Sequence, residues 1–297
     1  MLRLTGMLFV LVIVGMYARK RNIITPESRA HLSDLLIEVI LPMNILSSFD
    51  IQLDTGLIWR AALALILSLG VQIFSVGLSR LLYGKTDASR QAVLRYSTVV
   101  SNAGFMGLPI VRAALGTEAA LYASIALIPM RVFMWSAGLS LFTKADAKSA
   151  LRRLLTHPCN IAVAAGFVVL LMPGGLPDFL SGAVSSVGNC ATAISMLIIG
   201  GFLAEIDIKS VITKEVLFYS AIRLILIPLA VLLLTALLQV DRLLAGALTL
   251  LAAMPAGSTT AILAAKYGGD AGFASKVIFV STVLSLITIP VFGLVAA

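Results

Sequence analysis

The chain has 297 residues, of which 60% are hydrophobic and only 12% are charged, and its mean hydropathy is +1.04. An ordinary soluble domain carries about 25% charged residues, so this composition excludes that class and predicts a protein that crosses a membrane several times. The excess of 22 Lys and Arg over 14 Asp and Glu gives a formal charge of +8, which in a membrane protein reports topology and does not indicate nucleic-acid binding.

Apolar runs predict about ten membrane spans, because a bilayer core requires about 20 apolar residues per helix. In chain order the spans lie near 2–18, 31–49, 57–82, 92–115, 118–142, 159–173, 178–202, 215–238, 242–265 and 272–295. The first run could be mistaken for a secretory signal, but it has no convincing small-residue cleavage site and ends in Arg19-Lys20-Arg21. We therefore expect a span there.

Basic residues gather in every second loop. The five basic loops contain Arg19, Lys20, Arg21 and Arg29; Arg80, Lys85 and Arg90; Lys144, Lys148, Arg152 and Arg153; Lys209 and Lys214; and Lys266 and Lys276. The opposite loops have little beyond Arg3, Arg60, Arg112 and Arg242. The positive-inside rule makes the five loops cytoplasmic and puts both termini outside. We expect a multi-pass protein of the cell membrane, and specifically of a bacterial inner membrane.

The predicted fold class is an all-α polytopic membrane protein built as two inverted five-helix repeats. A basic cytoplasmic linker at 144–158 separates the first repeat, 1–143, from the second, 159–297. Because each half has an odd number of spans, the second half enters the membrane upside down relative to the first. We expect no soluble domain in addition to these repeats.

The fourth and ninth predicted spans are interrupted at corresponding positions. The fourth carries Ser101-Asn102-Ala103-Gly104 and Pro109, and the ninth carries Met254-Pro255-Ala256-Gly257-Ser258-Thr259-Thr260. A proline removes a backbone N–H and crowds the preceding turn, which in a membrane is tolerated only against protein or water. A pair of interrupted helices is the best sequence indication of a transporter's binding site.

Half-helix ends at such breaks expose N–H groups and a positive dipole end, which favour an anion such as a carboxylate. The candidate substrate-binding residues at the two breaks are Ser101, Asn102, Gly104, Gly257, Ser258 and Thr259. The amide of Asn102 and the hydroxyls can donate hydrogen bonds, and the glycines allow close approach. The alternative is that these small residues only let two helices pack closely.

Arg131 is the most informative residue outside the breaks. It lies about 13 residues from either end of the fifth span, near the midplane by the helical rise, where a cation is costly. We hypothesise that it faces an aqueous cavity and pairs with a substrate carboxylate. The alternative is an internal ion pair with Glu38, in the second span, which is also the candidate for proton coupling if it is buried.

Arg223 lies about nine residues into the eighth span, near enough to the membrane surface for its side chain to reach it. A structural role and a cavity-lining role are both open. The two cysteines, Cys159 and Cys190, form neither a metal-ligand pattern nor a disulfide framework and are interpreted as buried small hydrophobic residues. No nucleophile, metal cluster or phosphate loop stands out, so we expect no enzyme activity, no metal and no cofactor.

These residues resemble a known family. Asn102-Ala103-Gly104-Phe105-Met106-Gly107-Leu108-Pro109 resembles the N-T-G-F-M-G-L-P signature of the auxin efflux carrier family, which includes bacterial malate and malonate permeases. Met254-Pro255 followed by Ala264-Ala265-Lys266-Tyr267-Gly268-Gly269-Asp270 is similar to the family's ninth-helix M-P-P and A-x-x-Y-G-G-D pattern, and Leu41-Pro42 to its L-P pair. The resemblance runs along nearly the whole chain.

The resemblance implies a fold in which the broken fourth and ninth helices cross. It implies that the spans near 2–18, 31–49, 159–173 and 178–202 form a scaffold and that the other spans form a moving transport domain. The chain departs from the family pattern at Thr259, where many bacterial members carry asparagine, and at Arg131, where a neutral or apolar residue is expected. Both departures put the substrate in doubt more than the fold.

The predicted function is secondary transport of small mono- or dicarboxylates by elevator-type alternating access. An anion channel is the main alternative, and a non-transporting membrane receptor for anions is a weaker one. The expected partners are a small carboxylate and the lipid bilayer, without nucleic acid. A homodimer is left open, as are the coupling ion, the direction of transport and the identity of the carboxylate.

Overall fold

The computed structural model describes residues 2–51, 55–84, 86–142, 147–204, 211–267 and 269–296. Lys85, Lys144 and Lys209 of the expected basic loops lie outside these residues, as do the first residues of the expected linker. The helices in chain order are α1 (Leu2–Lys20), α2 (Pro26–Leu35), η1 (Leu36–Ile40), α3 (Leu41–Ser48), α4 (Thr55–Leu82), α5 (Ala88–Val99), η2 (Ala103–Gly107), α6 (Leu108–Leu115), α7 (Thr117–Trp135), η3 (Leu139–Leu141), α8 (Ala147–Thr156), α9 (Pro158–Leu171), α10 (Asp178–Leu203), α11 (Lys214–Ala221), η5 (Ile222–Leu226), α12 (Ile227–Leu237), α13 (Arg242–Ala252), α14 (Thr259–Tyr267) and α15 (Ala271–Ala296).

Six helical stretches of the described chain are long and apolar enough to cross a membrane. They are Pro26–Ser48, Gly56–Leu82, Thr117–Leu141, Asp178–Gly201, Lys214–Leu237 and Ala271–Val295. Shorter apolar helices cover Ala103–Leu115, Pro158–Leu171 and Arg242–Ala252. The protein is thus a multi-pass, all-helical chain over the part described, while the arrangement as ten helices in two inverted repeats stays a prediction.

Three π-helical turns are explained by proline. The turns η1, η2 and η5 each precede a helix whose second residue is proline, namely Pro42, Pro109 or Pro228. A proline at this position has no N–H to donate, and its ring crowds the carbonyl four residues earlier, which in each case lies inside the π turn. Widening the turn by one residue relieves that clash while the apolar helix continues.

Two helices differ from the expected boundaries of spans and loops. The second span begins earlier than residue 31, because Thr25 accepts a hydrogen bond from the N–H of Ser28 and Pro26 fits the first turn. The linker at 144–158 is not simply a loop, since it contains α8. Its leucines recur at helical spacing between basic residues, and Leu151 and Leu155 are exposed.

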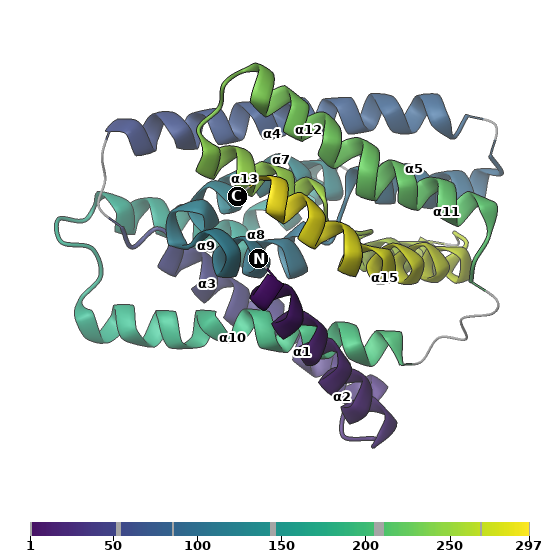
Figure 1. Ribbon diagram of the computed structural model, residues 1–297, viewed down its shortest axis with the longest axis horizontal. Coiled ribbons are helices and arrows are strands. Elements are labelled where there is room, and N and C mark those ends of the chain that lie inside the picture. Colours follow the sequence, from purple (N-terminus) through teal and green to yellow (C-terminus); the bar gives the residue numbers. More distant parts are fainter. Residues whose placement is uncertain are drawn as a thin grey trace.

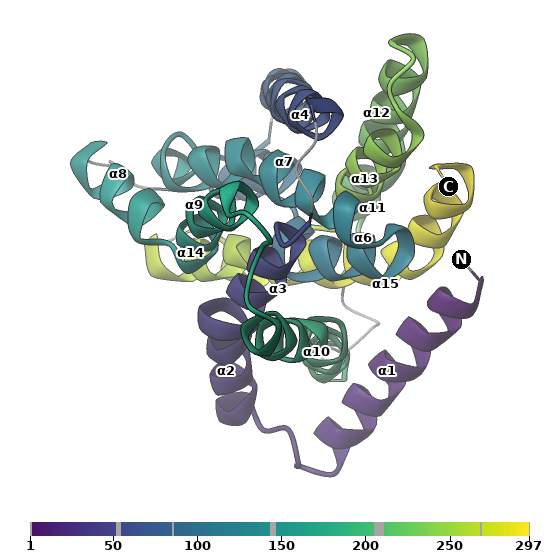
Figure 2. The same cartoon turned by 90° about the vertical axis from the view of Figure 1, so that its left-hand side faces the viewer.

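The helices form two packed groups, with α1, α2 and α10 on one side of the molecule, α4 and α12 on the other, and α3 and α9 between them (Figures 1 and 2). In the first group α1 packs along α10, which also contacts α2 and α3, and α3 packs on α9. In the second group α4 packs on α7, α12 on α13, and α11 and α13 on α15. Contacts between the groups are led by α3 with α7, followed by α10 with α6 and η2 and by α1 with α15.

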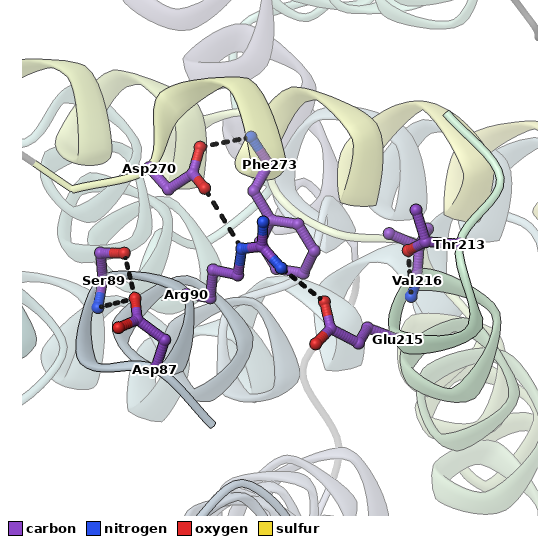
Figure 3. A network of polar contacts seen from close by, with 8 residues as sticks. All are labelled: Asp87, Ser89, Arg90, Thr213, Glu215, Val216, Asp270 and Phe273. Carbon is purple, nitrogen blue, oxygen red and sulfur yellow. Dashed lines mark hydrogen bonds and ion pairs between the residues drawn. The ribbon is translucent and has the colours of Figure 1, made fainter. Parts of the chain in front are cut away.

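At one end of the second group, Arg90 connects three helices (Figure 3). Its guanidinium lies 3.1 Å from Glu215 of α11 and 3.4 Å from Asp270 before α15, and it covers the ring of Phe273. These side chains are a third to a half exposed, so each pair contributes only about 0–1 kcal/mol. Asp87 caps α5 beside them, and the hydroxyl and N–H of Ser89 hold the pKa of its carboxyl below the usual value.

Candidate functional site

The two interrupted helices meet backbone to backbone. Ser101 and Ala256 form an antiparallel bridge, in which the N–H of Asn102 donates to the carbonyl of Pro255 at 2.8 Å and the N–H of Gly257 donates to the carbonyl of Val100 at 3.3 Å. Each break therefore supplies the partners that the other lost when its helix was interrupted. We call these two segments, residues 100–102 and 253–258, the crossover.

Glycines let the crossover segments approach closely on one side and leave space on the other. A Cβ at Gly107 would lie 2.9 Å from Cγ of Met254, and one at Gly257 would lie 3.2 Å from the carbonyl oxygen of Ser101. A Cβ at Gly104 would meet no atom within 4 Å. Gly107 and Gly257 thus serve packing, whereas Gly104 borders open space.

The helices η2 and α14 begin at the crossover, so their first N–H groups lie there, although those of Thr260 and Ala261 in α14 donate to the carbonyls of Gly257 and Ser258. Such groups lack acceptors within the helix and carry the positive end of its dipole. Asn102, Gly104, Ser258 and Thr259 are partly exposed there. The Asn102 side chain forms no hydrogen bond to any residue of the described chain, whereas the Thr259 hydroxyl accepts one from Tyr96 at 3.2 Å.

Other residues expected at the site have packing or backbone roles. Ser101 is buried, and its hydroxyl lies 3.7 Å from the sulfur of Met130. Pro109 opens α6 after the π turn, and its carbonyl faces the hydroxyl of Thr192 on α10 at 3.5 Å. Pro255 lies within the second break, where its carbonyl is part of the bridge.

Arg223 is the arginine at the crossover. It is buried, and its Nε donates to the carbonyl of Met254 at 3.0 Å while Nη1 donates to the carbonyl of Thr98 at 3.4 Å. The guanidinium thus caps the C-terminal ends of α5 and α13 together. It also lines a cavity of about 60 Å³, whose polar wall includes Gln72 and Ser101. The geometry fits both roles left open for Arg223, since it joins two helix ends and lines a cavity, but the side chain is buried and does not reach the membrane surface as expected.

Arg131 does not lie at the crossover. It is buried at 4% exposure between α7 and α9, does not line that cavity, and donates one long hydrogen bond of 3.4 Å to Oδ1 of Asn160. It forms no ion pair with Glu38 or any other carboxylate of the described residues. Glu38 is exposed on the surface of the chain, so the burial on which its proposed coupling role depends is not found.

Sequence reasoning did not identify the α4 wall of the cavity. Gln72 has a buried side-chain nitrogen without a partner, and Ser68 and Ser75 lie one turn away on either side. Isolated polar residues at a spacing of three to four in an apolar span are the signal that could have indicated this face. Among the described residues no cluster of three His, Cys, Asp or Glu could hold a metal ion.

Comparison with known proteins gives two matches. The model of the family described as "Membrane transport protein" matches residues 6–151 and 145–293. The chain is also 23% identical over 290 residues to an "Uncharacterized transporter" of Methanothermobacter thermautotrophicus, and the alignment covers 96% of this chain and 95% of that protein.

Proposed function

The chain belongs to the membrane transport protein family, and we therefore propose that it is a secondary carrier that moves small organic anions, mono- or dicarboxylates, across the cell membrane. The single observation that carries the substrate class is the crossover. Two helices start there from partly exposed, hydrogen-bond-donating residues, and a carboxylate is the ligand that matches N–H groups at a positive helix end.

The first carboxylate of the substrate binds beside Asn102 and Gly104. The amide of Asn102 donates from its side chain, and the space next to Gly104 brings the ligand close to the backbone of η2. From the other broken helix, Ser258 and Thr259 add hydroxyls, while Ser101 and Gly257 hold the two backbones together.

A second carboxylate pairs with Arg131, which favours dicarboxylates. Its guanidinium can make five hydrogen bonds, yet within the described chain it makes one long one. Arg131 follows Met130, whose sulfur lies 3.7 Å from the hydroxyl of Ser101 of the crossover, but its own side chain points toward Asn160 of α9, so the second carboxylate extends from the crossover toward α9. A buried cation without a charged partner gains most from an anionic ligand.

Transport proceeds by movement of one helix group against the other. The first group, α1, α2, α3, α9 and α10, acts as the scaffold embedded in the bilayer, and the second group carries the crossover. Because the helices contact one another less across the interface than within each group, a displacement can break it without unfolding either group. In this proposal both termini of the protein lie outside the cytoplasm.

The test is flux of labelled carboxylates into proteoliposomes that contain the purified protein. A carrier gives saturable uptake that unlabelled substrate inside the vesicles accelerates, whereas a channel gives flux that neither saturates nor shows this acceleration. A thermal-shift screen of mono- and dicarboxylates identifies the ligand, because a bound anion stabilises the fold by RT ln(1 + [L]/Kd). Binding without flux would favour a receptor.

A further inference from the structure

Each break leaves one N-terminal helix end, with a partial positive charge, and one C-terminal helix end, with a partial negative charge. The surroundings of these two kinds of end differ. The N-terminal ends, at η2 and α14, adjoin partly exposed residues and open space at Gly104. The C-terminal ends, at α5 and α13, carry partial negative charge on their last carbonyls. In carriers with broken helices, such carbonyls and the unwound backbone beside them coordinate a coupling cation.

In this protein five of those carbonyls have donors from the chain itself, namely those of Ser97, Thr98, Val100, Met254 and Pro255. Arg223 holds the carbonyls of Thr98 and Met254, and Tyr219 donates from its hydroxyl to the carbonyl of Ser97 at 2.9 Å. The carbonyls of Val100 and Pro255 are taken by the crossover bridge. A metal cation that bound the carbonyls of Thr98 and Met254 would have to displace the guanidinium of Arg223.

The charge of Arg223 is not neutralised by a side chain. No carboxylate among the described residues forms an ion pair with it, and the groups that interact with it electrostatically are the phenols of Tyr219 and Tyr83. Its counter-charge is therefore the set of helix C-termini. A fixed guanidinium in this position repels a second cation and makes the site an unsuitable one for Na⁺.

We infer that Arg223 is a built-in cation of the crossover, which takes the place of a bound coupling cation, so that transport needs no Na⁺. The inference rests on the proposed function for its transport readout only. Arg223 is a positioning residue here: it joins the ends of α5 and α13 and thereby holds the opposite ends, η2 and α14, in place for the anion.

The first experiment compares the wild-type protein in NaCl, KCl and choline chloride of equal ionic strength. Carboxylate exchange in proteoliposomes is expected at the same rate in all three, and the melting temperature of the purified protein is expected to be the same. Uptake that requires Na⁺, or a melting temperature raised by Na⁺ alone, would overturn the inference. Absence of flux in every salt would instead contradict the proposed function. The inference about Na⁺ would then be decided by the comparison of melting temperatures.

The second experiment removes the cation. Arg223→Ala is expected to melt at a lower temperature and to raise the substrate KM by about tenfold, as expected for loss of charge-assisted hydrogen bonds. Guanidinium at low millimolar concentration should raise the melting temperature of this variant but not of the wild type, and Na⁺ should do so in part. Arg80→Ala, at an exposed arginine, is the matched control and should respond to neither cation.

Arg223→Lys keeps the charge but cannot reach both carbonyls with one planar group, so it should fall between the wild type and the alanine variant. If Arg223→Ala melts at a lower temperature yet gains nothing from guanidinium or Na⁺, the site is not a cation position and the inference fails. If Arg223→Ala does not fold, the inference is tested by the melting temperature and KM of Arg223→Lys and by the comparison of the wild type in the three salts.

Discussion

Asn102 is the residue whose side chain is best placed to donate to an anion at the crossover. It is partly exposed, and its amide has no hydrogen-bond partner in the described chain, although its backbone N–H is fixed at 2.8 Å from the carbonyl of Pro255. Backbone and side chain therefore have separate tasks: the first joins the two breaks, and the second is available to a ligand.

Asn102→Ala is expected to raise the KM for carboxylate exchange by about tenfold, since a hydrogen bond to a charged group contributes about 1.5–3 kcal/mol. The melting temperature without substrate should stay near that of the wild type, because no side-chain hydrogen bond is lost. Kinetics in proteoliposomes and thermal unfolding measure the two quantities. Asn189→Ala, at an exposed asparagine of α10, is the control, and an equal effect in both variants would contradict the role of Asn102.

Arg131→Gln should weaken dicarboxylates more than monocarboxylates, because only the former offer a second charge to the guanidinium. The measurement is the ratio of KM values for a dicarboxylate and a monocarboxylate of matched length. A folded, correctly inserted variant that transports every tested anion as the wild type does would rule out this role.

At this scale the sequence allowed the polar residues of the breaks to be selected but not their partners. Asn102 and Gly104 were recognisable because an amide and a glycine are unusual in an apolar span. That Arg223 and not Arg131 lines the crossover cavity was not predictable, because both are single arginines in spans and only the packing of α11 and η5 against the breaks distinguishes them.

Among the elements, η2 has a packed face and an open face, and each of them carries a glycine. Gly107 faces Met254 across the broken helices, and Gly104 borders open space. Alanine at Gly107 therefore tests the packing of the crossover, and alanine at Gly104 tests the access of a ligand to it.

Gly107→Ala is expected to destabilise the protein by about 1–3 kcal/mol, as overpacking does, because its Cβ would lie 2.9 Å from Met254 and 3.0 Å from Leu251. Gly104→Ala should leave the melting temperature unchanged but raise KM, since its methyl group occupies the space proposed for the carboxylate. Thermal unfolding and exchange kinetics on both variants form one matched experiment. Equal behaviour of the two variants would show that η2 does not have these two faces.

The positions of the helices were predictable to different degrees. Long apolar runs and the Pro-containing breaks are local signals, and helices or interruptions are found at these places. Helix α8 and the start of α2 were missed, because a hydropathy criterion does not detect short amphipathic or capped segments. The π turns follow from proline, but their width depends on continuous packing along the helix, which sequence alone does not give.

For the whole molecule, Arg112 forms the clearest polar contact between the two helix groups. From α6 its Nη1 donates to the carbonyl of Asn44 at 3.0 Å and to the hydroxyl of Ser47, both on α3. The buried thiol of Cys159 on α9 interacts electrostatically with Arg131 on α7, so it reports on another part of the same interface.

Arg112→Ala removes two hydrogen bonds from a charged group across the interface, so it should favour separation of the groups and speed maleimide labelling of Cys159 by at least about tenfold, the effect of about 1.5 kcal/mol. The background is Cys190→Ser, which removes the exposed thiol. Arg242→Ala, at an exposed arginine of the second group, is the control. Equal labelling rates with and without Arg112 would contradict a closing role for this contact.

The crossover bridge also imposes an order on biosynthesis. The chain is made from its N-terminus, so residues 100–102 enter the membrane long before residues 253–258 are synthesised. Until then the N–H of Asn102 and the carbonyl of Val100 have no partner, a state that hydrocarbon does not tolerate. The nascent first half must therefore keep this segment against water or the insertion machinery, and its helices reach their final packing only when the second half arrives.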